Sequence, residues 1–152
     1  MKRLPIIALA LACTFTSCKK DKDEVKPKTK SELLTARNWR VSAATYVVGT
    51  NTQDVYASTP ACSKDDFTKF NADKTALFDE GPSRCFNGDP QSSPGAWDLT
   101  SGETRLLIQE STTSTSGELY DIVELSESTL TLRQTDNTSS PAETITITFT
   151  AF

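Results

Sequence analysis

Apolar and polar residues alternate strictly near the end of the chain, where threonines separate Ile145, Ile147 and Phe149. A period of two residues places one set of side chains on one face of a β-strand and the other set on the opposite face. Earlier segments carry a shorter or less regular form of this pattern and are rich in β-branched and aromatic residues. The eight expected strands cover residues 39–48, 67–70, 75–79, 95–99, 104–110, 119–125, 129–134 and 144–150.

Turn-forming residues connect these segments, and most connections are shorter than the dozen or so residues that a parallel crossover needs. The strands are therefore expected to be antiparallel, in an all-β fold. Eight up-and-down strands with one apolar face favour a closed barrel, because closure leaves no unpaired strand edge. A β-sandwich is the less favoured alternative. The longest connections, residues 49–61 and 81–94, are expected to be long loops.

A short helix is expected before the first strand. Residues 31–37 are good helix formers, and Thr29 or Ser31 can cap the first turn. Leu33 and Leu34 are expected to pack against an apolar surface. Ahead of this helix, residues 19–30 combine many charged residues with a proline, which predicts a disordered tether.

The first 18 residues have the layout of a lipoprotein signal peptide. Lys2 and Arg3 precede an apolar run that ends near Leu11, and small residues lead to Cys18. The apolar run of about ten residues is too short to span a bilayer, which needs roughly 20. We expect cleavage before Cys18 and lipidation of its thiol. Cys13 is the alternative lipidated residue, and ordinary secretion is the alternative to lipidation.

These features divide the chain into a signal peptide at 1–17, a disordered tether at 18–30 and a β-barrel domain at 31–152. The protein is expected to reside in the cell envelope as an outer membrane lipoprotein. Its domain would then face the periplasm or the cell surface and touch the membrane only through the anchor at Cys18. We expect it to be a monomer.

The domain is acidic. The chain has 16 Lys and Arg and 20 Asp and Glu; two basic residues lie in the signal peptide, and residues 19–30 hold six basic and three acidic ones. This leaves 8 basic and 17 acidic residues from Ser31 onward, a net charge of −9. A surface of this sign repels phosphate groups, so we expect no nucleic acid partner.

The chain contains no histidine. This excludes Ser-His-Asp and Cys-His catalysis and zinc sites with histidine ligands. Only carboxylate chemistry remains, and no nucleophile motif accompanies it. We therefore expect no enzymatic activity, no cofactor and no metal site.

Two cysteines, Cys62 and Cys85, remain in the domain. An exported chain meets an oxidising compartment, so a disulfide is expected, with a free thiol pair or a metal site as the alternatives. If Phe70 pairs with Thr75 in the hairpin between them, Cys62 lies two positions away from facing Cys85. A bridge there is geometrically reasonable and would tie both long loops to one end of the barrel.

Several short motifs, in this order and spacing, are familiar. They are Leu33-Leu34-Thr35 ahead of Asn38-Trp39, Cys62-Ser63-Lys64-Asp65-Asp66, Phe70-Asn71-Ala72-Asp73, Asp79-Glu80-Gly81, Cys85, Gly95-Ala96-Trp97 and Tyr120-Asp121-Ile122-Val123-Glu124-Leu125-Ser126. With them, residues 31–152 resemble the lipocalin-like domain family of small lipoproteins from Gram-negative bacteria. The resemblance implies an eight-stranded lipocalin-like barrel in which Trp39, after a short helix, closes the floor. Lys74 departs from the pattern, since glycine usually follows Asn-Ala-Asp.

An eight-stranded barrel is just wide enough to be filled by side chains or to hold one small ligand. Its apolar residues therefore have two interpretations. Trp39 is expected to be structural. The candidate ligand contacts are Tyr56, as part of a lid, and Phe70, Phe78, Trp97 and Tyr120, for which a role in the core or wall is favoured.

Two acidic pairs, Asp65-Asp66 and Asp79-Glu80, flank the expected hairpin. They can serve as calcium ligands or as a catalytic carboxylate pair, but solvated strand ends are the favoured interpretation.

The sequence thus favours a membrane-anchored binding protein for a small hydrophobic or amphipathic ligand. A module that binds another protein or a glycan through its loops, with a solid barrel core, is the alternative. The volume of the interior separates the two, because a drug-sized ligand needs a connected void of about 300 Å³ or more.

Overall fold

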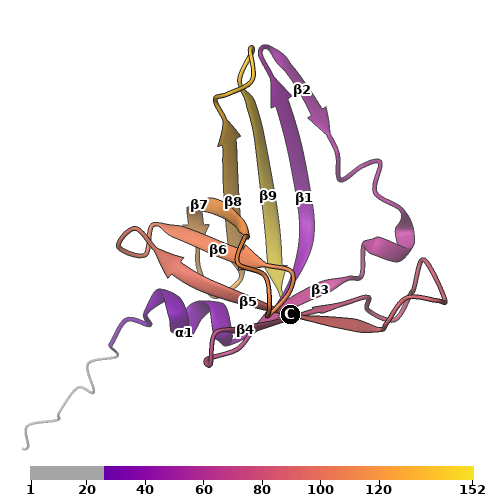
Figure 1. Ribbon diagram of the computed structural model, residues 1–152, viewed down its shortest axis with the longest axis vertical. Helices are drawn as coiled ribbons and strands as arrows, with labels where there is room; N and C mark the ends of the chain where they lie inside the picture. Colours follow the sequence, from indigo (N-terminus) through magenta and orange to yellow (C-terminus); the bar gives the residue numbers. More distant parts are fainter. Residues whose placement is uncertain (1–25) are drawn as a thin grey trace, which may run out of the picture.

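The computed structural model describes residues 26–152, so Cys18 and the rest of the first 25 residues lie outside the described part (Figure 1). Within 26–152 the chain forms one α-helix, one short 3-10 helix at Ala61–Ser63 and a nine-stranded sheet. The elements are α1 (Lys30–Thr35), β1 (Asn38–Val48), β2 (Asn51–Asp54), β3 (Phe67–Phe70), β4 (Thr75–Asp79), β5 (Ser92–Thr100), β6 (Arg105–Gln109), β7 (Glu118–Leu125), β8 (Thr129–Asp136) and β9 (Glu143–Ala151).

The sheet closes into a barrel. Strands β3 to β9 follow one another in chain order, and every pairing is antiparallel. Strand β1 closes the ring, because it pairs with β9 from Trp39 to Val48 on one side and with β3 at Asn38 and Trp39 on the other. The expected eight-stranded antiparallel up-and-down barrel is confirmed, and the sandwich alternative is wrong.

Strand β2 is a ninth, short strand that lies inside the connection expected to be a loop. It pairs with the second half of β1, from Val48 opposite Asn51 to Thr45 opposite Asp54. The turn between them starts at Gly49, whose φ of +58° suits the tight turns of β-hairpins. All four residues of β2 are polar and exposed, so no apolar alternation marks the strand in the sequence.

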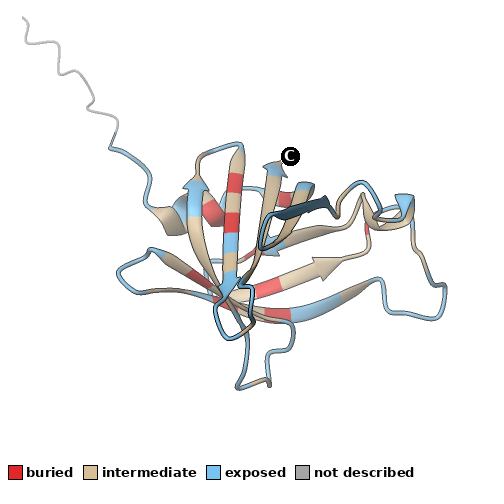
Figure 2. Cartoon of the chain, turned by 90° about the horizontal axis from the view of Figure 1, so that it is seen from above, coloured by how far each residue is buried: buried red, intermediate tan, exposed pale blue. Residues whose placement is uncertain are grey.

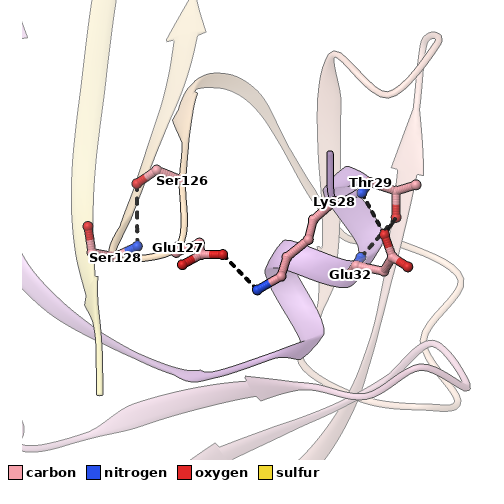
Figure 3. Close-up of polar contacts among 6 residues, drawn as sticks. All are labelled: Lys28, Thr29, Glu32, Ser126, Glu127 and Ser128. Carbon is pink, nitrogen blue, oxygen red and sulfur yellow. Dashed lines mark hydrogen bonds and ion pairs between the residues drawn. The ribbon is translucent and has the colours of Figure 1, made fainter. Parts of the chain in front are cut away.

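One end of the barrel is closed by α1. Thr29 caps this helix in a reciprocal capping box with Glu32, and the helix begins one residue before the expected start (Figure 3). Leu34 and Trp39 are fully buried, and the indole Nε1 of Trp39 donates a hydrogen bond of 2.8 Å to the carbonyl oxygen of Leu34. Trp39 thus fixes the helix to the barrel floor.

Lys28, at the end of the expected tether, forms an ion pair of 2.7 Å with Glu127 in the β7–β8 turn (Figure 3). The part of the tether next to the domain therefore lies against the closed end of the barrel.

The core lies next to this closed end, and most of its buried positions are on the strands (Figure 2). Its buried residues are Leu34, Trp39, Phe70, Ala76, Trp97, Leu106, Leu130 and Leu132. The rings of Phe70 and Trp97 meet edge to face with centroids 5.5 Å apart. Trp97 Nε1 donates a hydrogen bond of 3.0 Å to the carbonyl oxygen of Asn71, which satisfies its buried polar atom.

The expected disulfide between Cys62 and Cys85 is present, with Cα atoms 5.2 Å apart. It joins the segment before β3 to the β4–β5 connection, at the end of the barrel opposite α1 (Figure 1). The expected hairpin register is wrong by one position: Phe70 pairs with Ala76, not Thr75. The turn is one residue longer, because Asn71 bonds back to Thr75 and Lys74 takes a left-handed conformation with φ of 70°.

In residues 26–152 we find no helix that is long and apolar enough to cross a membrane.

Candidate functional site

The barrel is wider at the end opposite α1. In Figure 1, β1, β8 and β9 rise together, whereas β3, β4 and the β4–β5 connection run off in another direction. The β1–β3 ladder ends at Trp39, so beyond this residue the two strands separate. A cavity of about 220 Å³ lies where they part.

The cavity has an apolar floor and an acidic rim. Its lining consists of Trp39, Val41, Asp66, Phe67, Thr68, Phe78, Asp79, Glu80, Pro90, Ser92, Ser93 and Phe149. The volume is below the roughly 300 Å³ expected for a drug-sized ligand, which sets an upper limit on what the cavity can enclose.

A glycine makes room for one wall of this cavity. A Cβ atom on Gly95 would lie 2.4 Å from Cε2 of Phe78 and 2.3 Å from the carbonyl oxygen of Gln109. Any larger residue would therefore move the Phe78 ring, which faces Ser93 across the β4–β5 ladder. The Gly95-Ala96-Trp97 motif thus packs Trp97 into the core and leaves space for Phe78.

The acidic rim results from the pairing of β3 with β4. Phe67 lies opposite Asp79, so continuing the register by one residue places Asp66 opposite Glu80. Gly81 comes next, with φ of +64°, and a Cβ there would lie 2.4 Å from the carbonyl oxygen of Asp65. Only glycine allows this approach, which brings both acidic pairs together.

Two of the four carboxylates have structural partners. Asp65 Oδ2 accepts a hydrogen bond of 2.9 Å from the amide of Ser83. Asp79 Oδ1 accepts one of 2.9 Å from the amide of Gly81 and one of 3.1 Å from Gln91 Nε2. These contacts shape the loop that follows β4.

The Oδ1 atoms of Asp65 and Asp66 are both buried without a hydrogen-bond partner among the described residues, but of the two residues only Asp66 lines the cavity. Burial raises the pKa of the Asp66 carboxyl above its usual range, and the charges of Glu80, Asp65 and Asp79 raise it further. Within residues 26–152 no group of three or more acidic, cysteine or histidine side chains is arranged to hold a metal ion.

Of the residues predicted from sequence to contact a ligand, Phe78 lines the cavity. Phe70 and Trp97 lie in the core and are not part of its lining. Tyr120 packs against the core, and burial followed by the charges of Glu118 and Glu110 raises the pKa of its phenol.

Tyr56 does not line this cavity; it lines a second groove of about 170 Å³ that also includes Arg40 and Phe152. The guanidinium carbon of Arg40 is 4.3 Å from the centre of the Phe152 ring. This contact places the groove beside the end of β9, next to the outward-facing Arg40 of β1.

Sequence reasoning missed the contribution of Val41 and Ser93 to the cavity, and it treated the acidic pairs as solvated strand ends. Phe149 was among the apolar residues for which a role in the core or in the pocket lining was expected. The signal for Val41 was its alternation with Trp39, which places both on the inner face. The signal for the acids was their symmetric position around the hairpin.

A wider hollow of about 500 Å³ lies at the β6–β7 connection. Its lining is Ile108, Glu110, Ser111, Ser114, Ser116, Gly117 and Glu118. One apolar side chain among serines and glutamates offers little surface for an apolar ligand, so the smaller cavity is the better candidate despite its size.

No protein-family model matches the chain, and a search of curated proteins gives no match. Among solved structures, the chain is similar to a complex of bovine odorant binding protein with a selenium-containing odorant. The sequences are 14% identical, the alignment covers 85% of this chain and 76% of that chain, and the TM-score is 0.43. Such a likeness concerns the fold, and the barrel assignment itself rests on the strand pairing described above.

Proposed function

We propose that this protein binds a small apolar or amphipathic molecule in the cavity above Trp39. The observation that carries the proposal is the cavity itself, in which aromatic side chains from β1, β4 and β9 form an apolar floor beneath polar groups at the rim. Apolar surface removed from water there contributes about 25 cal/mol per Å² to binding. Such a site holds its ligand by shape and desolvation, without covalent chemistry.

The size of the cavity restricts the ligand. About 220 Å³ suits a small molecule, or one apolar end of a longer molecule whose remainder extends between the open-end loops. A fully enclosed drug-sized ligand does not fit.

Native mass spectrometry tests this proposal with the protein purified from its own host. The wild-type protein is expected to carry a co-purifying small molecule that is released on denaturation. Ser93→Leu fills the cavity from an exposed lining position, so this variant is expected to show no bound molecule in the mass spectrum. Ser128→Leu makes the same change in the exposed β7–β8 turn at the closed end and is expected to keep the molecule. A wild-type protein without any bound molecule would contradict the proposal.

We further propose that the protein acts at a membrane of the cell envelope, anchored through a lipid on Cys18. The layout of the first 18 residues supports this, as does a disulfide suited to an oxidising compartment. Cell fractionation tests it. Cys18→Ser is expected to leave the membrane fraction, and Cys13→Ser to remain there. If Cys18→Ser stays with the membrane and a double variant does not, Cys13 is the anchor.

A second candidate is an interaction module that meets a partner protein through the open-end loops. The observation that favours it is Phe86, which is 70% exposed directly beside the disulfide residue Cys85. A large aromatic side chain at the surface of a tethered loop can serve as the anchor residue of a protein interface. Under this candidate, Phe86→Ser removes a partner from the wild-type native mass spectrum, whereas Ser93→Leu keeps it.

A further inference from the structure

We infer that the molecule bound in this cavity carries a positive charge, and that its class is a small amine with an apolar body. The inference rests on the proposed ligand-binding function and adds the charge of the ligand. It follows from the distribution of charge over the two faces of the barrel and from the geometry around Asp66.

Basic side chains are confined to the outer face of the strands. In the strands described, each Lys or Arg is the sequence neighbour of a residue that is buried in the core. These buried neighbours are Trp39, Phe70, Leu106 and Leu132. Because neighbouring residues of a strand point to opposite faces, the basic ones point outward. They are Arg40, Lys69, Arg105 and Arg133.

Acidic side chains occupy the inner face near the open end. Each of them lies an even number of positions along its strand from a residue that points inward, so its side chain points inward as well. The hydrogen bonds of two of them agree with this orientation. Gln134 Nε2 donates a hydrogen bond of 2.6 Å to Glu118, and the Tyr46 hydroxyl donates one to Glu143. The inner acids at or next to strand ends are Asp66, Glu80, Glu110, Glu118, Asp136 and Glu143. A cation that enters the barrel therefore meets only attractive charge on the inner wall of the described strands.

Within the cavity, the group best placed to receive the cation is Asp66. Both Asp66 and Glu80 line the cavity, together with Asp79. The buried Oδ1 of Asp66 lacks a hydrogen-bond partner in the described structure, and an ammonium N–H would supply one. Burial raises the pKa of Asp66 and repulsion by Glu80, Asp65 and Asp79 raises it further, and a cation at Asp66 would relieve this repulsion.

The rest of the lining defines the body of the ligand. Trp39, Phe78 and Phe149 provide aromatic and apolar surface directly below the carboxylates. A hydrated metal ion would gain nothing from such walls, whereas an organic amine places its charge at the rim and its apolar part on the floor. The ligand is thus an amphiphile with its cationic group toward the mouth.

Three probes of nearly equal size and shape test the inference: 2-phenylethylamine, 2-phenylethanol and phenylacetate, which are a cation, a neutral molecule and an anion at pH 7. NMR titrations of the protein report both affinity and location, through shifts at Phe78, Ser93 and Trp39. We expect the amine to bind at least about tenfold more tightly than the alcohol, and the anion to bind least.

Asp66→Asn is expected to remove most of this preference and to leave binding of the alcohol unchanged. Glu124→Gln is the matched control, because it removes one negative charge from an exposed position on the outer face of β7 and is expected to keep the preference. Glu80→Gln is a second variant of the rim and is expected to reduce the preference in part.

The outcomes separate the two proposals. If the alcohol binds at Phe78 as tightly as the amine, or if Asp66→Asn keeps the preference, the charge inference is wrong and the binding function stands. If calcium alone binds at Asp66 and displaces the amine, the site is one for a metal and the inference is also wrong. If none of the three probes shifts cavity residues, the proposed binding function itself fails, and the charge inference with it.

Discussion

At the scale of single residues, Lys74 shows how a local cost is offset by neighbours. Its φ of 70° is unfavourable for a residue with a side chain, by about 1 kcal/mol relative to glycine. Its ammonium lies 3.1 Å from Asp98 and 4.1 Å from the centre of the Trp97 ring. Both partners belong to β5, where Trp97 points into the core and Asp98 is exposed, so the side chain ties the hairpin turn to the next strand.

Substitution of Lys74 separates the two effects. Lys74→Ala loses both contacts and keeps the unfavourable backbone, so we expect it to lower the free energy of unfolding by about 1 kcal/mol. Lys74→Gly loses the same contacts and relieves the backbone, so it should be close to wild type. Urea denaturation measures the difference between the variants. Equal stability of the alanine and glycine variants would contradict the backbone cost.

Asp66 allows a prediction about pH. Its folded-state pKa is raised, first by burial and then by neighbouring carboxylates, so the folded protein holds this proton more tightly than the unfolded chain does. Stability therefore falls as the pH rises from the ordinary aspartate value of 3.8 through the raised value in the fold. We expect Asp66→Asn to be more stable than wild type at pH 7 and the gain to disappear below about pH 4.

Thermal denaturation from pH 3 to pH 8 measures this difference. Glu124→Gln removes the same charge from the outer face and should show no comparable gain at neutral pH. A gain of Asp66→Asn that is the same at every pH would show that ionisation of Asp66 is not its cause. Residues of a binding site often lower the stability of the fold, so removal of one repelling carboxylate from the rim is expected to stabilise the protein.

At the scale of elements, apolar alternation was sufficient to predict all eight strands of the ring, because each has one face on the core. It could not predict β2, whose four exposed polar residues are held by backbone pairing with β1 and by the Gly49 turn. It also misplaced the β3–β4 register by one residue. The length of that turn depends on the left-handed conformation of Lys74. A lysine gives no sign of a positive φ in the sequence, whereas a glycine would have indicated one.

The disulfide is the strongest link between the elements of the open end. Its two cysteines are separated by 23 positions in the sequence. A cross-link over a loop of this length restricts the unfolded chain and thereby adds about 3 kcal/mol to the free energy of unfolding. We expect the Cys62→Ser, Cys85→Ser double variant to lose about this amount in urea denaturation under non-reducing conditions. Wild-type protein in reductant should match the variant, and the variant should not respond to reductant. An unchanged unfolding midpoint would contradict this contribution.

At the scale of the whole molecule, the sequence predicted the barrel and its closed floor more fully than the binding site. The floor depends on local motifs, since Trp39 lies only a few residues after the end of the helix that it anchors. The cavity depends on where β1 and β3 separate, and the inner acids depend on the register of several strands at once. The acidic pairs were visible, but the inward orientation of Asp66 and Glu80 emerged only when the β3–β4 register was continued by one residue beyond Phe67 and Asp79.

The two ends of the barrel should therefore differ in local stability. Strands β1 and β9 pair along their whole shared length and are continuous with β8, whereas β1 and β3 pair only at Asn38 and Trp39. The β3–β4 hairpin contributes Phe70 and Ala76 to the buried core, whereas β1 and β8 contribute Trp39, Leu130 and Leu132, so we expect the hairpin to open at a lower free energy. Native-state hydrogen exchange should show the slowest amides near Leu132 and Ile147, and faster exchange in β2 and β3.

Reduction of the disulfide provides the internal control for this last prediction. It should speed exchange in β3, β4 and the β4–β5 connection, because these segments are joined by the Cys62–Cys85 bond. Exchange in β8 and β9 should become faster only by the factor that corresponds to the loss in the free energy of global unfolding. If reduction speeds amide exchange equally in all strands, the molecule opens as one unit. In that case the open end has no independent motion that could admit a ligand.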